Sequence, residues 1–270
     1  MTHPEHAAIA TTVRGWFSES APEMGYQRER RRYGVYGRHA AAGGEVLLRD
    51  LALAEVDDCL RDARDYFVGA ESTIYIEDRA LDAALRPALL ARGCVAVDTQ
   101  SYLAHVGPLP TADPMPDLAL EDVTDATLDA WVVTKLRGFA SDDAQPDAEV
   151  IATQTALRRA EMADVGRLRL ARIAGDPAAV LGWYEDADRF IYNLATRLPY
   201  RQRGIARYLL CDFLAESAAR GSRSTLINAD TAGTSITLYR RLGFIDEVYW
   251  RAKYRLIALA CGGTRVELES

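Results

Sequence analysis

Six consecutive residues, Arg201-Gln-Arg-Gly-Ile-Ala206, have the types and spacing of a loop that binds phosphate. Gly204 permits a tight turn and places no side chain between the backbone and a ligand. Where a helix begins just after such a glycine, its first N–H groups are unpaired and carry the positive end of the helix dipole. A phosphate placed there accepts several backbone hydrogen bonds, and Arg201 or Arg203 adds positive charge at its edge. The pattern alone is weak, so its interpretation depends on the surrounding elements.

A second candidate for chemistry is Tyr239, within Leu238-Tyr-Arg-Arg-Leu-Gly-Phe244. A phenol is neutral at pH 7 and can donate its proton to a group that becomes negative during a reaction. The alternative is a half-buried helical aromatic residue that only packs against a sheet. The sequence leaves both interpretations of Tyr239 open.

The hydrophobic pattern of the second half predicts the elements that position both motifs. Residues 190–196 form a strand before the loop, and a helix over 204–220 follows, with Ile205, Leu209 and Phe213 four residues apart on one face. The other expected elements are strands over 117–123, 167–173, 178–184 and 225–228, a long strand or a hairpin over 244–257, and helices over 124–139, 148–163 and 234–242. This order is typical of a mixed α/β fold.

The first half repeats part of this order. Strands are expected over 45–51, 73–76 and 94–106, and helices over 54–67 and 81–90. Gly69 and Gly221, which end corresponding helices, are 152 residues apart, and Gly93 and Gly243 are 150 apart. The shared offset predicts two related lobes, each a mixed, mostly antiparallel sheet flanked by helices. The alternative is that any two α/β segments look alike at this level of detail.

A proline-rich stretch separates the two halves. Residues 107–116 contain four prolines, which exclude a helix or a central strand. We therefore expect an N-terminal lobe over 1–107, a linker over 108–116 and a second domain over 117–270.

Composition excludes several classes of protein. The net charge of −7 argues against a nucleic-acid-binding protein, and no apolar run approaches the ~20 residues that span a bilayer. The four cysteines are far apart, so we expect no metal site and no disulfide framework, and the N-terminus does not resemble a secretory signal. These features predict a cytoplasmic protein.

The basic run at 28–33 suits either an anion site or, as the commoner case, the solvated face of a helix.

With both motifs in place, residues 117–257 resemble the GNAT superfamily of acyl-CoA-dependent N-acetyltransferases. The signature loop of that superfamily matches residues 201–206, after a strand and a proline lead-in over 194–200. Its second hallmark, Leu-Tyr-x-x-Leu-Gly-Phe, is intact at 238–244. The chain further resembles tandem members of the mycothiol synthase kind, in which one lobe is degenerate. Here residues 51–56, at the position of the loop in the first lobe, include Glu55 but no glycine or arginine, so we expect no coenzyme A there.

The resemblance implies a role for each matching position. The loop would hold the pyrophosphate of acetyl-CoA, or of another acyl-CoA, without any metal. On the preceding strand, which splays from the next one in this superfamily, Leu194 and Thr196 would bind the pantetheine chain and the acyl carbonyl through their backbone groups. Tyr239 would protonate the departing thiolate. The residues assigned to the loop are Arg201, Gln202, Arg203, Gly204, Ile205 and Ala206.

The base that deprotonates the amine is less clear, because the strand over 190–196 has no Glu or Asp, unlike a common family pattern. Asp230, at the end of the next strand, is our candidate, and a water chain to a carboxylate is an alternative. The other candidates lie in the preceding turn: Glu185, Asp186 and Asp188. Cys211 lies within a helix with no histidine nearby, which disfavours a covalent acyl-enzyme.

Together these features predict transfer of an acetyl group to the primary amine of a small molecule by direct attack, in a monomer or homodimer without nucleic-acid or membrane partners. The alternatives are a non-catalytic acyl-CoA sensor, or an acyl-CoA enzyme of different outcome, such as an O-acyltransferase or a decarboxylase. The sequence does not identify the acceptor.

Overall fold

A computed structural model describes residues 27–39, 43–49, 51–68, 71–105, 107–163, 166–185 and 188–257. These residues form two compact units. Unit 1 contains residues 100–250, and unit 2 contains the described part of 26–99 together with 251–257.

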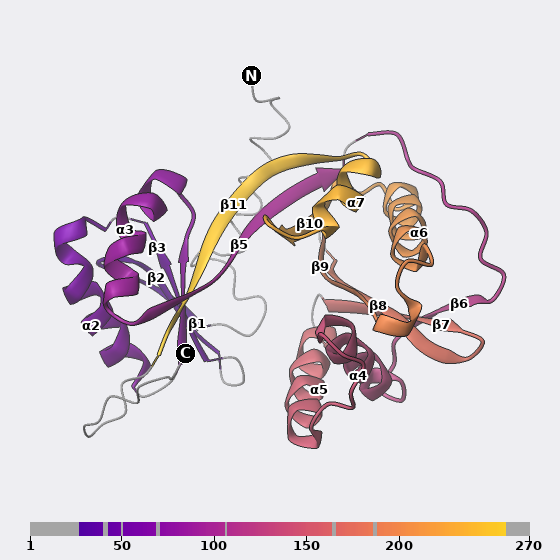
Figure 1. Cartoon of the computed structure of the whole chain (residues 1–270), viewed down its shortest axis with the longest axis horizontal. Coiled ribbons are helices and arrows are strands. Elements are labelled where there is room, and N and C mark those ends of the chain that lie inside the picture. Colours follow the sequence, from indigo (N-terminus) through magenta and orange to yellow (C-terminus); the bar gives the residue numbers. More distant parts are fainter. Residues whose placement is uncertain are drawn as a thin grey trace. The chain divides into compact units, whose positions relative to one another are not determined.

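Unit 1 is built on a mixed sheet in which the strand order is β5-β10-β9-β8-β7-β6 (Figure 1). Neighbouring strands are antiparallel except for β9 and β10, which run parallel. The strands are β5 (Cys94–His105), β6 (Leu118–Asp122), β7 (Gly166–Ile173), β8 (Asp176–Tyr184), β9 (Arg189–Thr196) and β10 (Thr225–Asp230). Alternating apolar residues in these strands supply both faces of the sheet with core side chains.

Helices cover both faces of this sheet (Figure 1). One face carries α4 (Leu128–Phe139) and α5 (Ala148–Met162), and the other carries α6 (Ile205–Ala219) and α7 (Ser235–Arg241). Adjacent residues of β8 separate the two cores: Val180 packs with α4, whereas Leu181 packs with α6 and α7. The strands and helices that the sequence predicts in this half are therefore present, with ends that differ by a few residues.

Unit 2 repeats the pairing pattern of unit 1 in the order β1-β2-β3-β4-β11. Only β3 and β4 are parallel. Its strands are β1 (Gln27–Arg31), β2 (Gly34–His39), β3 (Gly43–Leu48), β4 (Ser72–Ile76) and part of β11 (Phe244–Leu256), and its helices are α2 (Val56–Phe67) and α3 (Arg79–Ala91). Because α2 joins β3 to β4 as α6 joins β9 to β10, the expected relationship between the lobes is visible in both topology and strand direction.

The two halves of the sequence exchange one strand each. In unit 1, β10 pairs with β5, a strand of the first half, over residues 225–230. In unit 2, β4 pairs with residues 252–256 of β11, the last strand of the chain. The compact units consequently divide at residues 100 and 251, which differs from the expected boundary at the proline-rich linker. The linker lies within unit 1.

The basic run at 28–33 forms β1 and a turn, so the expectation of a helix was wrong. Arg28 pairs with Glu45 at 2.8 Å, and Arg31 pairs with Asp62 at 2.8 Å. These carboxylates pair with the arginines from β3, the second strand along the sheet, and from α2. No described helix is both long enough and apolar enough to cross a membrane.

Candidate active site

Strands β9 and β10 separate partway along their length. They pair at three positions, from Thr225 opposite Arg189 to Ile227 opposite Ile191. Beyond that point β9 stays paired with β8 as far as Thr196, and β10 stays paired with β5. Within the part of the chain that the structure describes, the edge of β9 that faces β10 therefore has no strand partner over residues 192–196.

The free edge presents the backbone of alternate residues. The N–H of Arg197 donates to the carbonyl of Ala178 at 2.9 Å, on the β8 side. Because successive residues in a strand point their backbone groups to opposite edges, Leu194 and Thr196 present theirs to the free edge. These are the two residues whose backbone the resemblance assigns to a pantetheine chain.

The loop after β9 has the backbone that a tight turn into a helix requires. Gly204 has a φ of 81° and immediately precedes α6, and Gln202 also has a positive φ of 61°. A Cβ atom at Gly204 would meet nothing within 4 Å. The glycine is therefore required by its left-handed backbone, and the space above it is open.

A row of N–H groups faces this space. The N–H of Arg201 donates to Leu198, and the next backbone bond is from Tyr208 to the carbonyl of Gly204 at 2.9 Å. Between them, the N–H groups of residues 202–207 have no acceptor among the described residues. The first turn of α6 also contains no acidic residue, so the positive end of its dipole is not neutralised locally. This arrangement suits an anion with several oxygen atoms.

The side chain of Arg201 does not extend into the open space as expected. Its Nε donates to the carbonyl of Thr196 at 3.1 Å, and one terminal nitrogen donates to the carbonyl of Gly138 at 2.9 Å. Arg201 therefore ties the loop to the ends of β9 and α4. Arg203 is exposed, with its guanidinium 5.7 Å from the centre of the Tyr200 ring, and is the loop arginine available to a ligand.

The remaining loop residues contribute through the backbone. Gln202 is exposed, Ala206 is half-buried, and Ile205 is buried beside Leu209 in the core under α6. The buried Ile205 side chain fixes the first turn of the helix to the sheet, which holds the free N–H groups in place.

Tyr239 lies on α7 beside the point where the two strands separate. It is buried in one core with Ile191 and Ile227, the last pair between β9 and β10. Burial raises the pKa of Tyr239 to about 12, and a hydrogen bond with Ser235 opposes this shift. The phenol is consequently a proton-bearing donor throughout the physiological pH range. The buried Tyr239 ring also packs in the core, which is the other role that the sequence left open.

Asp230, the expected base, ends β10 on the surface. Its Oδ1 accepts the N–H of Ala232 at 2.9 Å, and its carbonyl accepts the N–H of Gly233 at 2.9 Å. The carboxylate therefore closes the turn between β10 and α7, a common use of aspartate. This contact leaves the second carboxylate oxygen for other partners.

The other carboxylates considered from sequence have structural partners. Asp188 is fully buried and accepts the hydroxyl of Ser224 at 2.6 Å, beside Arg223. Glu185 accepts the indole N–H of Trp183 at 2.6 Å and pairs with Arg189 at 3.1 Å. Asp186 lies outside the described residues.

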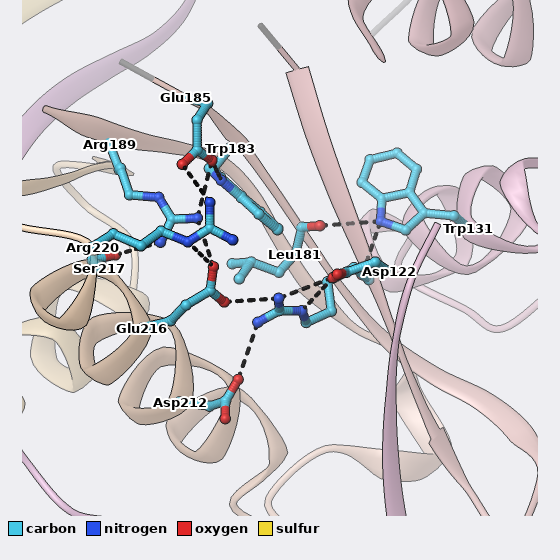
Figure 2. A network of polar contacts seen from close by, with 11 residues as sticks. Asp122, Trp131, Leu181, Trp183, Glu185, Arg189, Asp212, Glu216, Ser217 and Arg220 are labelled. Carbon is cyan, nitrogen blue, oxygen red and sulfur yellow. Dashed lines mark hydrogen bonds and ion pairs between the residues drawn. The ribbon is translucent and has the colours of Figure 1, made fainter. Parts of the chain in front are cut away.

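Two arginines anchor α6, the helix that begins at the loop, to the sheet (Figure 2). Arg169 on β7 donates to Asp122, Asp212 and Glu216 at 2.9, 3.1 and 2.8 Å. Arg189 on β9 donates to Glu216 at 3.1 Å. Burial acts to raise the pKa of Glu216, but the two arginines hold it below its ordinary value. The network fixes the helix axis, and hence the loop, relative to β9.

The sequence analysis missed a second polar cluster, on the face of α4 and α5. Glu161 accepts the hydroxyl of Tyr192 at 2.9 Å and that of Tyr184 at 3.4 Å, and it pairs with Arg158 at 2.6 Å. Its side chain is only 8% exposed. The one sequence signal is the Arg158–Glu161 spacing of three residues, which is also common on solvated helices.

The described residues of unit 2 form no opening equivalent to that of unit 1. Strands β3 and β4 pair over five positions, as far as Leu48 opposite Ile76 at their ends. Before α2, Glu55 accepts the N–H of Ala52 at 3.3 Å and pairs with Arg32 at 2.6 Å. In unit 2, the position that corresponds to the loop of unit 1 is thus occupied by the Glu55 carboxylate. The two strands beside it are paired to their ends.

No family model matches the sequence, and no curated protein matches it. The structure is similar to a GCN5-related N-acetyltransferase from Kribbella flavida, with 17% identity, 96% of each chain covered and a TM-score of 0.61. It is similar to a Staphylococcus epidermidis protein of unknown function, with 9% identity, 90% of this chain and 98% of that chain covered and a TM-score of 0.69. It is also similar to a tandem GNAT protein from the clavulanic acid biosynthesis pathway, with 12% identity, 87% and 81% coverage and a TM-score of 0.54. The chain therefore has the fold of the GNAT N-acetyltransferases.

Proposed function

We propose that this chain is an acyl-CoA-dependent N-acyltransferase that moves an acetyl group from acetyl-CoA to the primary amine of a small molecule. The observation that carries the proposal is the separation of β9 from β10 beside the unpartnered N–H groups of residues 202–207. Either feature alone would suit many ligands. Together they suit a ligand with a diphosphate at one end and an amide-containing chain that pairs with a strand edge.

The described residues fit acetyl-CoA in three respects. The loop offers N–H groups and the exposed Arg203 to the diphosphate. The backbone of Leu194 and the N–H of Thr196, whose carbonyl already accepts Arg201, offer a strand edge to the amides of the pantetheine chain. The Oγ1 atom of Thr196 is buried and has no hydrogen-bond partner among the described residues, which is costly unless a ligand supplies one. The described residues contain no group of three or more His, Cys, Asp or Glu that could hold a metal ion.

The reaction would proceed by direct attack. The amine lone pair forms the C–N bond, the C–S bond breaks, and the thiolate leaves with the electron pair. A backbone N–H of β9 meets the negative charge that develops on the carbonyl oxygen. A free thiol has a pKa near 8.5, so a phenol whose pKa is about 12 retains its proton beside the thiolate. Tyr239 would therefore stabilise the leaving group by donating a hydrogen bond.

The test is thiol release from acetyl-CoA with a panel of small amines, combined with calorimetric measurement of acetyl-CoA binding. Release that depends on the amine, with an acetylated amine detected by mass spectrometry, would support the proposal. Binding without release would instead indicate a non-catalytic sensor. Release without any amine would indicate a different acyl-CoA reaction, and no binding would refute the placement of the cosubstrate.

A further inference from the structure

Resting on the function proposed above, we infer that Tyr192 and Glu161 form the path by which the acceptor amine loses its proton. The phenol of Tyr192 receives the amine proton while it passes its own to Glu161. This pair lies in unit 1 and involves none of the carboxylates considered from sequence. Four features of the described residues carry the inference: position, hydrogen bonding, burial and charge.

Tyr192 occupies an irregular position in β9. Gly182 of β8 faces Asn193 and Trp183 faces Ile191, so Tyr192 is the extra residue of a β-bulge. It directly follows Ile191, the last residue of β9 that pairs with β10. Bulges redirect side chains and occur beside active sites. Tyr192 thus marks the place where the free edge begins.

The same place is where a carrier bound along the free edge would present its thioester. The phosphate loop follows the far end of β9, so the chain attached to the diphosphate runs back from Thr196 towards Tyr192. These residues are separated by about 13 Å of strand, at about 3.3 Å per residue. The reacting carbonyl consequently lies near the bulge, whereas Asp230 is three residues beyond Ile227, the last residue of β10 that pairs with β9.

Hydrogen bonding links Tyr192 directly to Glu161. A carboxylate only accepts hydrogen bonds, so at 2.9 Å the phenol is the donor. Its oxygen also accepts a hydrogen bond from Arg158, which leaves one lone pair for an incoming proton. Burial raises the pKa of Tyr192, so a phenoxide would not persist. The phenol therefore works as a relay that loses one proton as it gains another. The proton that leaves the amine ends on Glu161 and then passes to water.

Burial makes Glu161 a stronger base than an ordinary glutamate, although its charged neighbours act in the opposite direction. Burial raises its pKa, which Arg158, Tyr192, Lys135 and Tyr184 oppose. Arg158 stays charged, with its guanidinium 5.5 Å from the centre of the Tyr192 ring, and its buried Nε has no partner among the described residues. Lys135 donates to Gln154 at 2.9 Å, and burial lowers its pKa to about 8. A carboxylate with a raised pKa is better matched to proton transfer near neutral pH.

Tyr184 supplies a matched control. Its ring stacks on that of Tyr192 at 4.3 Å, and its hydroxyl donates to the same carboxylate at 3.4 Å. Tyr184 lies on β8, which pairs with the opposite edge of β9 from the one where β10 separates. Removing either hydroxyl takes one hydrogen bond from Glu161. Only Tyr192, however, lies beside the place proposed for the acceptor amine.

The experiment compares Tyr192→Phe and Tyr184→Phe in the full chain, with acetyl-CoA and an amine accepted by the unmodified protein. We expect Tyr192→Phe to lower kcat/KM for the amine about 100-fold at pH 7 and Tyr184→Phe to lower it less than about threefold. The Kd for acetyl-CoA should be unchanged in both. The deficit of Tyr192→Phe should shrink as pH rises, because a larger fraction of the amine is already neutral; a structural defect would give a deficit independent of pH.

Glu161→Asp and Glu161→Gln extend the test. Glu161→Gln leaves buried Arg158 without its counter-ion and is expected to lose stability, whereas Glu161→Asp keeps the charge and should retain part of the activity. If Tyr192→Phe behaves as Tyr184→Phe does while the unmodified protein releases thiol with the amine, the relay is overturned and the proposed function stands. If the unmodified protein shows no release that depends on an amine, the proposed function is overturned together with the relay.

Discussion

Tyr239 and Tyr192 lie on opposite faces of the unit 1 sheet, beside the last residue pair between β9 and β10. Tyr239 belongs to the core of α6 and α7, which includes Ile191, whereas Tyr192 packs against the core of α4. A direct transfer needs a hydrogen-bond donor for the departing thiolate and a separate acceptor for the amine proton. In the proposed reaction, Tyr239 on one face of the sheet would be the donor and Tyr192 on the other face would be the acceptor.

Replacement of Gly204 tests the placement of the diphosphate. We expect Gly204→Glu to abolish measurable acetyl-CoA binding in calorimetry, because a carboxylate would compete for the free N–H groups. Its φ of 81° also adds strain of about 1–2 kcal/mol for any other residue. Gly221→Glu is the matched control, since Gly221 has a φ of 75°, follows the other end of α6 and has open space at its Cβ. Equal affinities for acetyl-CoA in the two variants would show that the loop does not bind the diphosphate.

Replacement of Tyr239 tests its role in the chemical step. We expect Tyr239→Phe to lower kcat about 10- to 100-fold with little change in the Kd for acetyl-CoA, because a hydrogen bond to a charged group is worth about 1.5–3 kcal/mol. The phenol, with a pKa of about 12, stays protonated across the assay range and should cause no alkaline loss of activity below about pH 10. Tyr200→Phe, which loses only a 3.4 Å contact with Asp176, serves as the control. An unchanged kcat would remove Tyr239 from the mechanism.

Arg201 is expected to act on the loop rather than on the ligand. Arg201→Ala removes the hydrogen bonds to the carbonyls of Thr196 and Gly138, so we expect a lower Tm together with weaker acetyl-CoA binding. Arg203→Ala removes an exposed side chain and should change the free energy of unfolding by less than about 0.5 kcal/mol. A weaker affinity without a change in Tm for Arg201→Ala would contradict this assignment and point to a direct contact with phosphate.

Local patterns were sufficient to predict the glycine turn before α6 and the elements around it. The alternation over 167–173 and the apolar face of 204–220 are properties of contiguous residues, and both appear as β7 and α6. Strands β1 and β2 were missed because residues 27–39 contain six basic side chains and few that alternate as apolar and polar. The opposed arginine–carboxylate pairs that stabilise β1 are contacts between distant residues, which no local pattern reveals.

The strand exchange and the buried Glu161 could not be predicted for the same reason. The pattern of 94–105 indicates a strand but does not specify that its partner is β10. The helix over 148–162 has weak amphipathic character, so its pattern does not distinguish a buried Glu161 from a solvated one. Both features depend on which elements meet in three dimensions.

The Arg169–Arg189–Glu216 network predicts an acid-dependent stability. The folded-state pKa of Glu216 is lowered, so its contribution is present above the unfolded pKa, near 4.5, and is lost as pH falls through the lower folded value. We expect Glu216→Gln to lower the free energy of unfolding by about 1–3 kcal/mol at pH 7 and much less at pH 3, measured by urea unfolding. Asp212→Asn, on the same helix with one contact to Arg169 and a side chain 43% exposed, should cost less than about 1 kcal/mol. A Glu216→Gln deficit that is as large at pH 3 as at pH 7 would show that the loss comes from packing and not from the charge of the carboxylate.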